Sequence, residues 1–118
     1  MAHHTPKHVK VTILGFSAKQ RTGERLPFDA VLPGRTYRHC NHKRLYAFVN
    51  FRNMRENQPF EAVWTLNGRR VSKATHRWPA GEKIVFDQFV SLRAGLYELF
   101  VRAAGELRAR GRVTVACG

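Results

Sequence analysis

The sequence predicts an all-β domain, folded as an antiparallel β-sandwich of about seven strands. Short segments in which every second residue is apolar follow one another along the chain, and turn-forming residues separate them. No window has the apolar spacing of an amphipathic helix. With 118 residues, of which 43% are hydrophobic, the chain has the size of one domain with a packed core.

The N-terminal third predicts a strand, a loop and an edge strand. Apolar and polar residues alternate over residues 9–13, which is typical of a strand. Residues 17–25 are polar and predict a loop. Residues 26–32 predict a short edge strand, because Pro27 and Pro33 would be poorly tolerated in a central one. We expect a flexible N-terminus over residues 1–7, a strand and arm over 8–33, and the sandwich over 34–118.

The rest of the chain predicts six further strands. The first of them is apolar on both faces, as expected for a central strand. These strands are expected at residues 45–49, 60–66, 70–74, 83–90, 96–102 and 106–117.

Asn67-Gly68 is the strongest hairpin signal, because a type I′ turn requires positive φ at both central residues. A two-residue loop at this point places Trp64 opposite Val71. One face of the preceding strand is then expected in the core, namely Phe60, Ala62, Trp64 and Leu66.

For the last hairpin we expect a three-residue loop over residues 103–105, in which Gly105 supplies the left-handed residue of a bulge. This register separates charged from apolar residues and pairs opposite charges across the strands. It also stacks an arginine on an aromatic ring. The expected pairs on that face are Arg102 with Glu106, Glu98 with Arg110 and Phe100 with Arg108.

Residues 92–99 resemble the corner before the penultimate strand of immunoglobulin-like and fibronectin type III-like sandwiches. In those domains a Gly-x-Tyr element carries a tyrosine whose hydroxyl bonds upstream backbone, which implies that role for Tyr97. Trp64 is similar to their core tryptophan. The resemblance covers roughly residues 37–117. An ordinary half-buried strand tyrosine is the other interpretation of Tyr97.

Two departures separate the chain from antibody-type domains. Arg93 stands where the family usually has aspartate, and Leu99 stands at the position of the second cysteine. The resemblance therefore implies a generic sandwich module. Such modules are mostly binding, adhesive or architectural, and they occur as accessory domains on bacterial surface and bacteriophage virion proteins.

The formal net charge of +13 points to an anionic partner. Fifteen of the 21 basic residues are arginines, whose planar fork suits carboxylate and phosphate. A solvated basic surface is the alternative interpretation. The residues that we expect to bind a partner are Arg69, Arg70, Phe100, Arg108, Arg110 and Arg112.

No catalytic motif or phosphate-binding glycine loop is present in the sequence, so we predict neither an enzyme nor a cofactor. The sequence His39-Cys40-Asn41-His42 is the best metal candidate, and Cys117 could complete a zinc set. Its spacing matches no standard zinc motif, and a polar turn is the alternative, so no metal is predicted. Reduced thiols are the default for the two cysteines, and a Cys40–Cys117 disulfide is the other possibility.

These observations predict a non-enzymatic structural or binding module that docks a basic face on an acidic protein surface. A decoration subunit of a capsid or other large assembly, such as a virion, would fit this description. The alternative is a nucleic-acid-binding protein that uses the arginine row and exposed aromatics. With no signal peptide or membrane span in the sequence, we expect a cytoplasmic or virion location. Homo-oligomerisation stays open.

Overall fold

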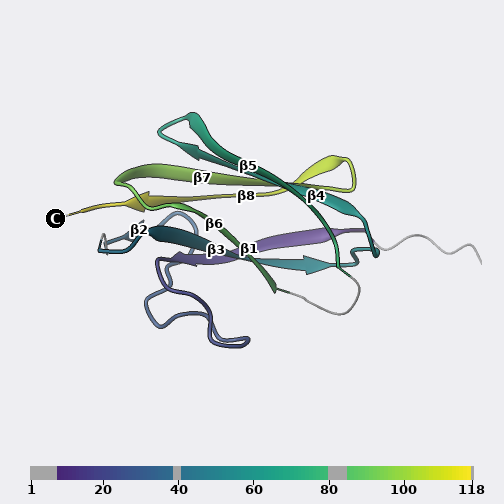
Figure 1. Ribbon diagram of the computed structural model, residues 1–118, viewed down its shortest axis with the longest axis horizontal. Coiled ribbons are helices and arrows are strands. Elements are labelled where there is room, and N and C mark those ends of the chain that lie inside the picture. The colour runs from purple at the N-terminus through teal and green to yellow at the C-terminus, as the bar shows by residue number, and fades with distance from the viewer. Residues whose placement is uncertain (1–7, 39–40, 80–84, 118) are drawn as a thin grey trace, which may run out of the picture.

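The computed structural model describes residues 8–38, 41–79 and 85–117. These ranges form two β-sheets packed on each other and contain no helix (Figure 1). The predicted fold class, an all-β sandwich, is confirmed. Residues 1–7, for which a flexible N-terminus is predicted, lie outside the described ranges.

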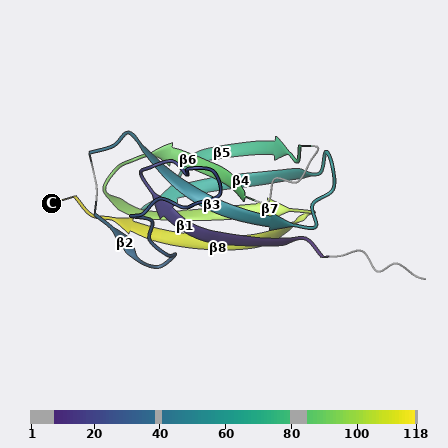
Figure 2. The ribbon, with the colours of Figure 1, turned by 90° about the horizontal axis from the view of Figure 1, so that it is seen from below.

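One sheet has the strand order β1-β3-β6, and the other has the order β2-β8-β7-β4-β5. Neighbouring strands are antiparallel except β2 and β8, which run parallel. In Figure 2 one sheet lies in front of the other, with β1 crossing β8. The strands are β1 (Lys10–Ser17), β2 (Thr36–Tyr37), β3 (Arg44–Arg52), β4 (Pro59–Leu66), β5 (Arg69–Arg77), β6 (Val85–Ser91), β7 (Gly95–Ala103) and β8 (Glu106–Val115).

The core lies between the sheets and is built from alternate residues of each strand. Trp64 is 1% exposed and packs edge-on against Phe16 and Tyr97, with ring centroids 6.0 Å apart in both pairs. The predicted core face of β4 is confirmed for three of its four residues, because Leu66 is only half-buried. Where β1 crosses β8, Gly111 leaves space for Ile13, whose Cδ1 would lie 3.0 Å from an added Cβ.

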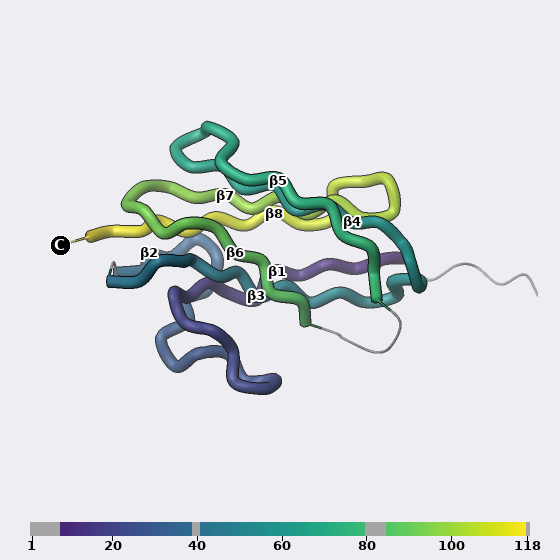
Figure 3. The backbone as a smooth tube through the Cα atoms, viewed as in Figure 1, coloured from purple at the N-terminus to yellow at the C-terminus, as the bar shows by residue number. Residues whose placement is uncertain are grey.

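The central strand β3 is buried on both faces, as its sequence predicts. Leu45, Ala47 and Val49 belong to the core, whereas Tyr46 and Phe48 point to the opposite face. The loop after β1 covers that outer face of the three-stranded sheet, and Figure 3 shows it below β3. One of its residues, Gln20, donates a hydrogen bond from Nε2 to the Tyr46 hydroxyl.

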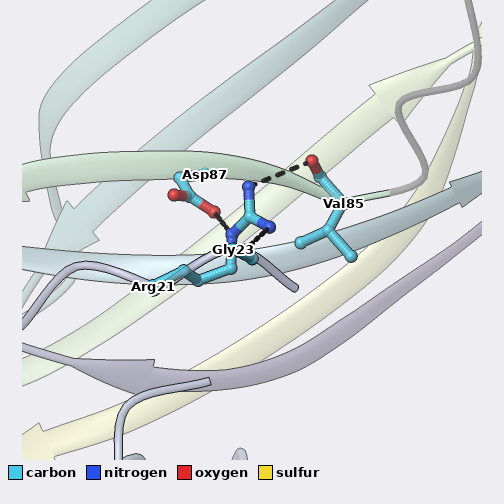
Figure 4. Close-up of polar contacts among 4 residues, drawn as sticks. All are labelled: Arg21, Gly23, Val85 and Asp87. Carbon is cyan, nitrogen blue, oxygen red and sulfur yellow. Dashed lines mark hydrogen bonds and ion pairs between the residues drawn. The ribbon is translucent and has the colours of Figure 1, made fainter. Parts of the chain in front are cut away.

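Arg21 connects this loop to β6 through an ion pair and a hydrogen bond, as Figure 4 shows. Its Nε lies 2.6 Å from Oδ1 of Asp87, and its guanidinium also bonds the carbonyls of Gly23 and Val85. The last residues of the same loop lie beside β8, where Pro33 and Gly34 line a hollow with Arg110 and Arg112.

The predicted edge strand over residues 26–32 is wrong. Only Val31 pairs there, in an isolated bridge with Phe16. The segment turns instead, because Ala30 donates its N–H to the Pro27 carbonyl and Asp29 accepts hydrogen bonds from Ser17 and Tyr37. The short β2, which the sequence did not predict, follows this turn.

The first predicted hairpin has the expected turn and a different register. Asn67 and Gly68 both have positive φ, 50° and 84°, as a type I′ turn requires. A bulge follows, so Trp64 lies opposite Ser72 instead of Val71. The extra residue, Val71, is 47% exposed.

The predicted three-residue loop of the last hairpin is wrong. Ala103 pairs with Glu106, and the two residues between them, Ala104 and Gly105, have φ of 52° and 77°. A bulge then makes Arg108 the extra residue. Its Nε donates to the Ala103 carbonyl at 2.9 Å, so the arginine side chain bonds the turn itself. This bulge produces the separation of charged and apolar faces for which the sequence predicts a longer loop.

The bulge also changes the expected cross-strand pairs. Glu98 lies opposite Arg112, and Phe100 lies opposite Arg110 instead of Arg108. Arg102 lies opposite Leu107 instead of Glu106.

Tyr97 makes the corner contact that the resemblance implies. It is fully buried, its hydroxyl donates to the Ser91 carbonyl at 2.6 Å, and it accepts from the Arg93 N–H at 2.8 Å. Burial raises the pKa of this phenol. The two bonds tie the turn before β7 to the strand that follows it.

Candidate protein-binding face

The outer face of the five-stranded sheet gathers the predicted arginines, and we call it the basic face. The alternation of the strands and their register place six basic side chains on it, with two carboxylates, Glu61 and Glu98, among them. The six are Arg70, Lys73, Arg77, Arg102, Arg110 and Arg112.

One cross-strand row shows how the face is organised. Lys73 lies opposite Val63, Val63 lies opposite Phe100, and Phe100 lies opposite Arg110. Val63 and Phe100 are half-buried, whereas Lys73 and Arg110 at the two ends are exposed. The row thus has an apolar centre and basic ends.

Both carboxylates of the face pair diagonally with basic neighbours. Glu98 Oε2 lies 2.9 Å from the Nη2 of Arg110, and Glu61 Oε2 lies 3.8 Å from the Nζ of Lys73. The expected Glu98–Arg110 pair is therefore present, in a different register from the one predicted. The Arg110 guanidinium also lies 5.4 Å from the centre of the Phe100 ring.

Four of the six predicted partner-binding residues lie together on the basic face, namely Arg70, Phe100, Arg110 and Arg112. The structure places the other two elsewhere. Arg108 bonds the carbonyls of the last turn and lies 3.4 Å from Glu106. Arg69 pairs with Leu66, so its side chain lies on the opposite face of β5.

Arg102 and Val63 also lie on the face, although they are not among the partner-binding residues that the sequence predicts. Their outward positions follow from the alternation of their own strands, which the sequence does reveal. That β4 and β7 are neighbours depends on sheet order, which a local pattern does not contain.

A hollow of about 400 Å³ opens at the β8 end of the face. It is lined by Glu98, Arg110, Gly111 and Arg112 from the sheet and by Pro33 and Gly34 from the loop before β2. The Gly34 N–H donates to the Arg112 carbonyl at 2.7 Å and holds that loop against β8. Arg112 makes no ion pair with a described residue, so its guanidinium faces solvent beside the hollow.

The aromatic residues near the first hairpin are not available for stacking with bases. Trp78 is only 7% exposed, and His76 stacks on Phe60 with centroids 5.2 Å apart. These two rings therefore do not supply the exposed aromatics that a nucleic-acid-binding protein would use.

No cluster of three metal-ligating side chains occurs within the described ranges. His39 and Cys40, central to the zinc candidate, lie outside those ranges. Cys117 is disulfide-bonded, which corrects the expectation of reduced thiols, and Cys40 is the only other cysteine of the sequence. No helix in the described part of the chain is long and apolar enough to cross a membrane.

Comparison with family models and with curated proteins found no match for this chain.

Proposed function

We propose that the protein is a non-enzymatic binding module of immunoglobulin-like type that docks its basic face on an acidic protein surface. The observation that carries the proposal is the row from Lys73 through Val63 and Phe100 to Arg110. An apolar centre with a charged rim is the usual anatomy of a protein–protein interface, and arginine and aromatic residues are enriched at such sites. An accessory subunit on a larger assembly, such as a virion, is the setting that we propose.

An acidic protein fits this face better than a nucleic acid does. Glu61 and Glu98 lie among the basic groups and already engage Lys73 and Arg110. These carboxylates weaken the attraction of the face for a uniformly charged phosphate backbone, whereas a protein surface can match mixed charges. The Phe100 ring is half-buried beneath Arg110, which leaves little of its face open to a base.

Matched variants test the proposal with poly-L-glutamate as the probe. The face variant Arg70→Gln/Arg112→Gln removes two exposed charges that pair with no described carboxylate. The control Arg25→Gln/Arg55→Gln removes the same charge from loops away from the face. The face variant should raise the dissociation constant about tenfold, and the control should raise it much less.

The same titrations with single-stranded and duplex DNA and RNA, at physiological ionic strength, decide between the two partner classes. We expect the ¹⁵N-labelled protein to show shifts on β7 and β8 with poly-L-glutamate that persist at this salt. The proposal would be overturned if a nucleic acid bound more tightly than poly-L-glutamate at physiological ionic strength. It would also be overturned if the face variant and the control variant lost the same affinity for poly-L-glutamate.

A further inference from the structure

Strand β5 forms one edge of the five-stranded sheet, and its outer side is open. It is the last strand in the sheet order, and no described residue pairs with its free side. Figure 1 shows it at the top of the sandwich, with no described strand beyond it. Its nine residues make it the longest edge strand of the two sheets.

The backbone hydrogen bonds just after β5 show which backbone groups of this strand face its open side. Trp78 donates its N–H to the Gln58 carbonyl and accepts from the Asn57 N–H, so its backbone faces β4. Antiparallel pairing alternates, so the backbone groups of Lys73 and Thr75 face the open side. Both residues are exposed.

The charge of β5 selects what can pair with this edge. Arg69, Arg70, Lys73 and Arg77 lie on it, and no acidic residue does. Two copies of β5 side by side would bring these like charges together, which opposes self-association. An extended segment rich in acidic residues meets opposite charges along the same edge.

A hollow of about 240 Å³ with a mixed apolar and polar lining lies beside Val71, at the hairpin end of β5. It is lined by Leu66, Val71, Val90 and Tyr97, and on its polar side by Ser91 and Arg93. The edges of β5 and β6 lie on the same side of the sandwich, since Phe86 of β6 is 5.8 Å from the His76 ring. Side chains of an added strand that point inward would approach this hollow.

The other edges are shorter or engaged. β2 has two residues, Phe16 of β1 pairs with Val31, and Arg21 bonds the Val85 carbonyl at the start of β6. The open edge of β5 is therefore the best place for a new strand.

We propose that β5 binds an extended segment of its partner by strand addition. The segment carries acidic residues at alternate positions on the side of the basic face and apolar residues between them. Main-chain hydrogen bonds would supply affinity, and the hollow would select the inward side chains. This inference rests on the proposed function, because both require an acidic protein partner.

The probe is a synthetic peptide in which glutamate alternates with valine. Its control is the same peptide with alternate backbone nitrogens methylated along one edge, which keeps the charge and removes strand pairing. The unmodified peptide should bind at least about tenfold more tightly than the methylated one. Equal binding of the two peptides would overturn strand addition.

Thr75→Pro tests the site on the protein. Its N–H faces the open side, so proline there leaves the pairing with β4 intact and blocks an added strand. We expect about a tenfold loss of peptide binding, with unchanged affinity for poly-L-glutamate. Unchanged peptide binding in a folded Thr75→Pro variant would overturn the site.

Lys73→Glu/Arg77→Glu provides a second measurement that needs no proline. This variant should bind the glutamate–valine peptide more weakly than the wild type does, and it should bind a lysine–valine peptide more tightly. The inference would be contradicted if the variant still preferred the glutamate–valine peptide as the wild type does. A wild-type dimer in sedimentation that Thr75→Pro abolishes would assign the edge to a second copy instead.

The two proposals fail in different ways. If Thr75→Pro has no effect on peptide binding while Arg70→Gln/Arg112→Gln still weakens poly-L-glutamate binding, only strand addition is wrong. If the face variant binds poly-L-glutamate as the wild type does, the docking face itself is wrong.

Discussion

At the scale of single residues, side chains that bond the backbone fix the turns. Tyr97 joins the carbonyl of Ser91 to the N–H of Arg93, and Arg108 bonds the carbonyls of the last turn. Asp29 holds the loop after β1 through side chains, because it accepts hydrogen bonds from the hydroxyls of Ser17 and Tyr37. Each of these contacts ties a segment that lacks a strand partner to a sheet.

Tyr97→Phe should lower the free energy of unfolding by about 1 to 2 kcal/mol, because it leaves two backbone groups without their partner. Urea unfolding measures the loss. The control is Tyr46→Phe, whose hydroxyl only accepts one bond from Gln20. An equal or larger loss in Tyr46→Phe would contradict the role given to the corner.

Two buried phenols make stability depend on pH in the alkaline range. Burial raises the pKa of Tyr97, and burial with a hydrogen bond to Asp29 raises that of Tyr37. Above the ordinary tyrosine pKa of about 10, the unfolded chain loses these protons first. Stability is therefore complete below that pH and falls as the pH rises toward the folded-state values.

Urea midpoints measured from about pH 9 to about pH 11 should show this decline. Replacing both Tyr37 and Tyr97 with phenylalanine should flatten it. A wild-type stability that is constant across the range would contradict the assigned pKa directions.

At the scale of elements, alternation in the sequence predicts the strands but not the bulges. Seven of the eight described strands lie on segments that the sequence predicts as strands, and β3 is predicted from a run that is apolar on both faces. The extra residues Val71 and Arg108 shift the register within hairpins whose turns carry clear signals. A bulge depends on what its extra side chain can bond after folding, as Arg108 shows, and a local pattern does not contain that information.

The same limit explains the failed edge strand. Residues 26–32 are apolar apart from Asp29, and Asp29 bonds two side chains from other elements and turns the segment. The candidate face could be predicted only in part for a related reason. Outward arginines follow from alternation within β8, whereas their neighbours Val63 and Lys73 follow from sheet order.

Ala104→Asn should stabilise the protein by about 1 kcal/mol, because Ala104 has a φ of 52° that asparagine tolerates better. Thermal unfolding measures the gain. Ala104→Val should have the opposite sign, since a β-branched side chain is strained in this region. Destabilisation by asparagine would contradict a two-residue turn at this point.

At the scale of the whole molecule, the excess of positive charge is distributed over loops, edges and the basic face. The loop after β1 covers the outer face of the three-stranded sheet, so the comparable face of the five-stranded sheet is the one left open. Its apolar centre and basic rim adjoin the edge of β5, whose free side pairs with no described residue. These features lie on one side of the sandwich, which is the surface that we propose for a partner.

The most direct test of the docking face is the salt dependence of poly-L-glutamate binding. It is measured on the wild type, on Arg70→Gln/Arg112→Gln and on Arg25→Gln/Arg55→Gln, from low to physiological ionic strength. Binding by the wild type should weaken steeply as salt rises, and the face variant should show a shallower slope than the control. The same slope in all three proteins, or wild-type binding that does not change with salt, would contradict the account.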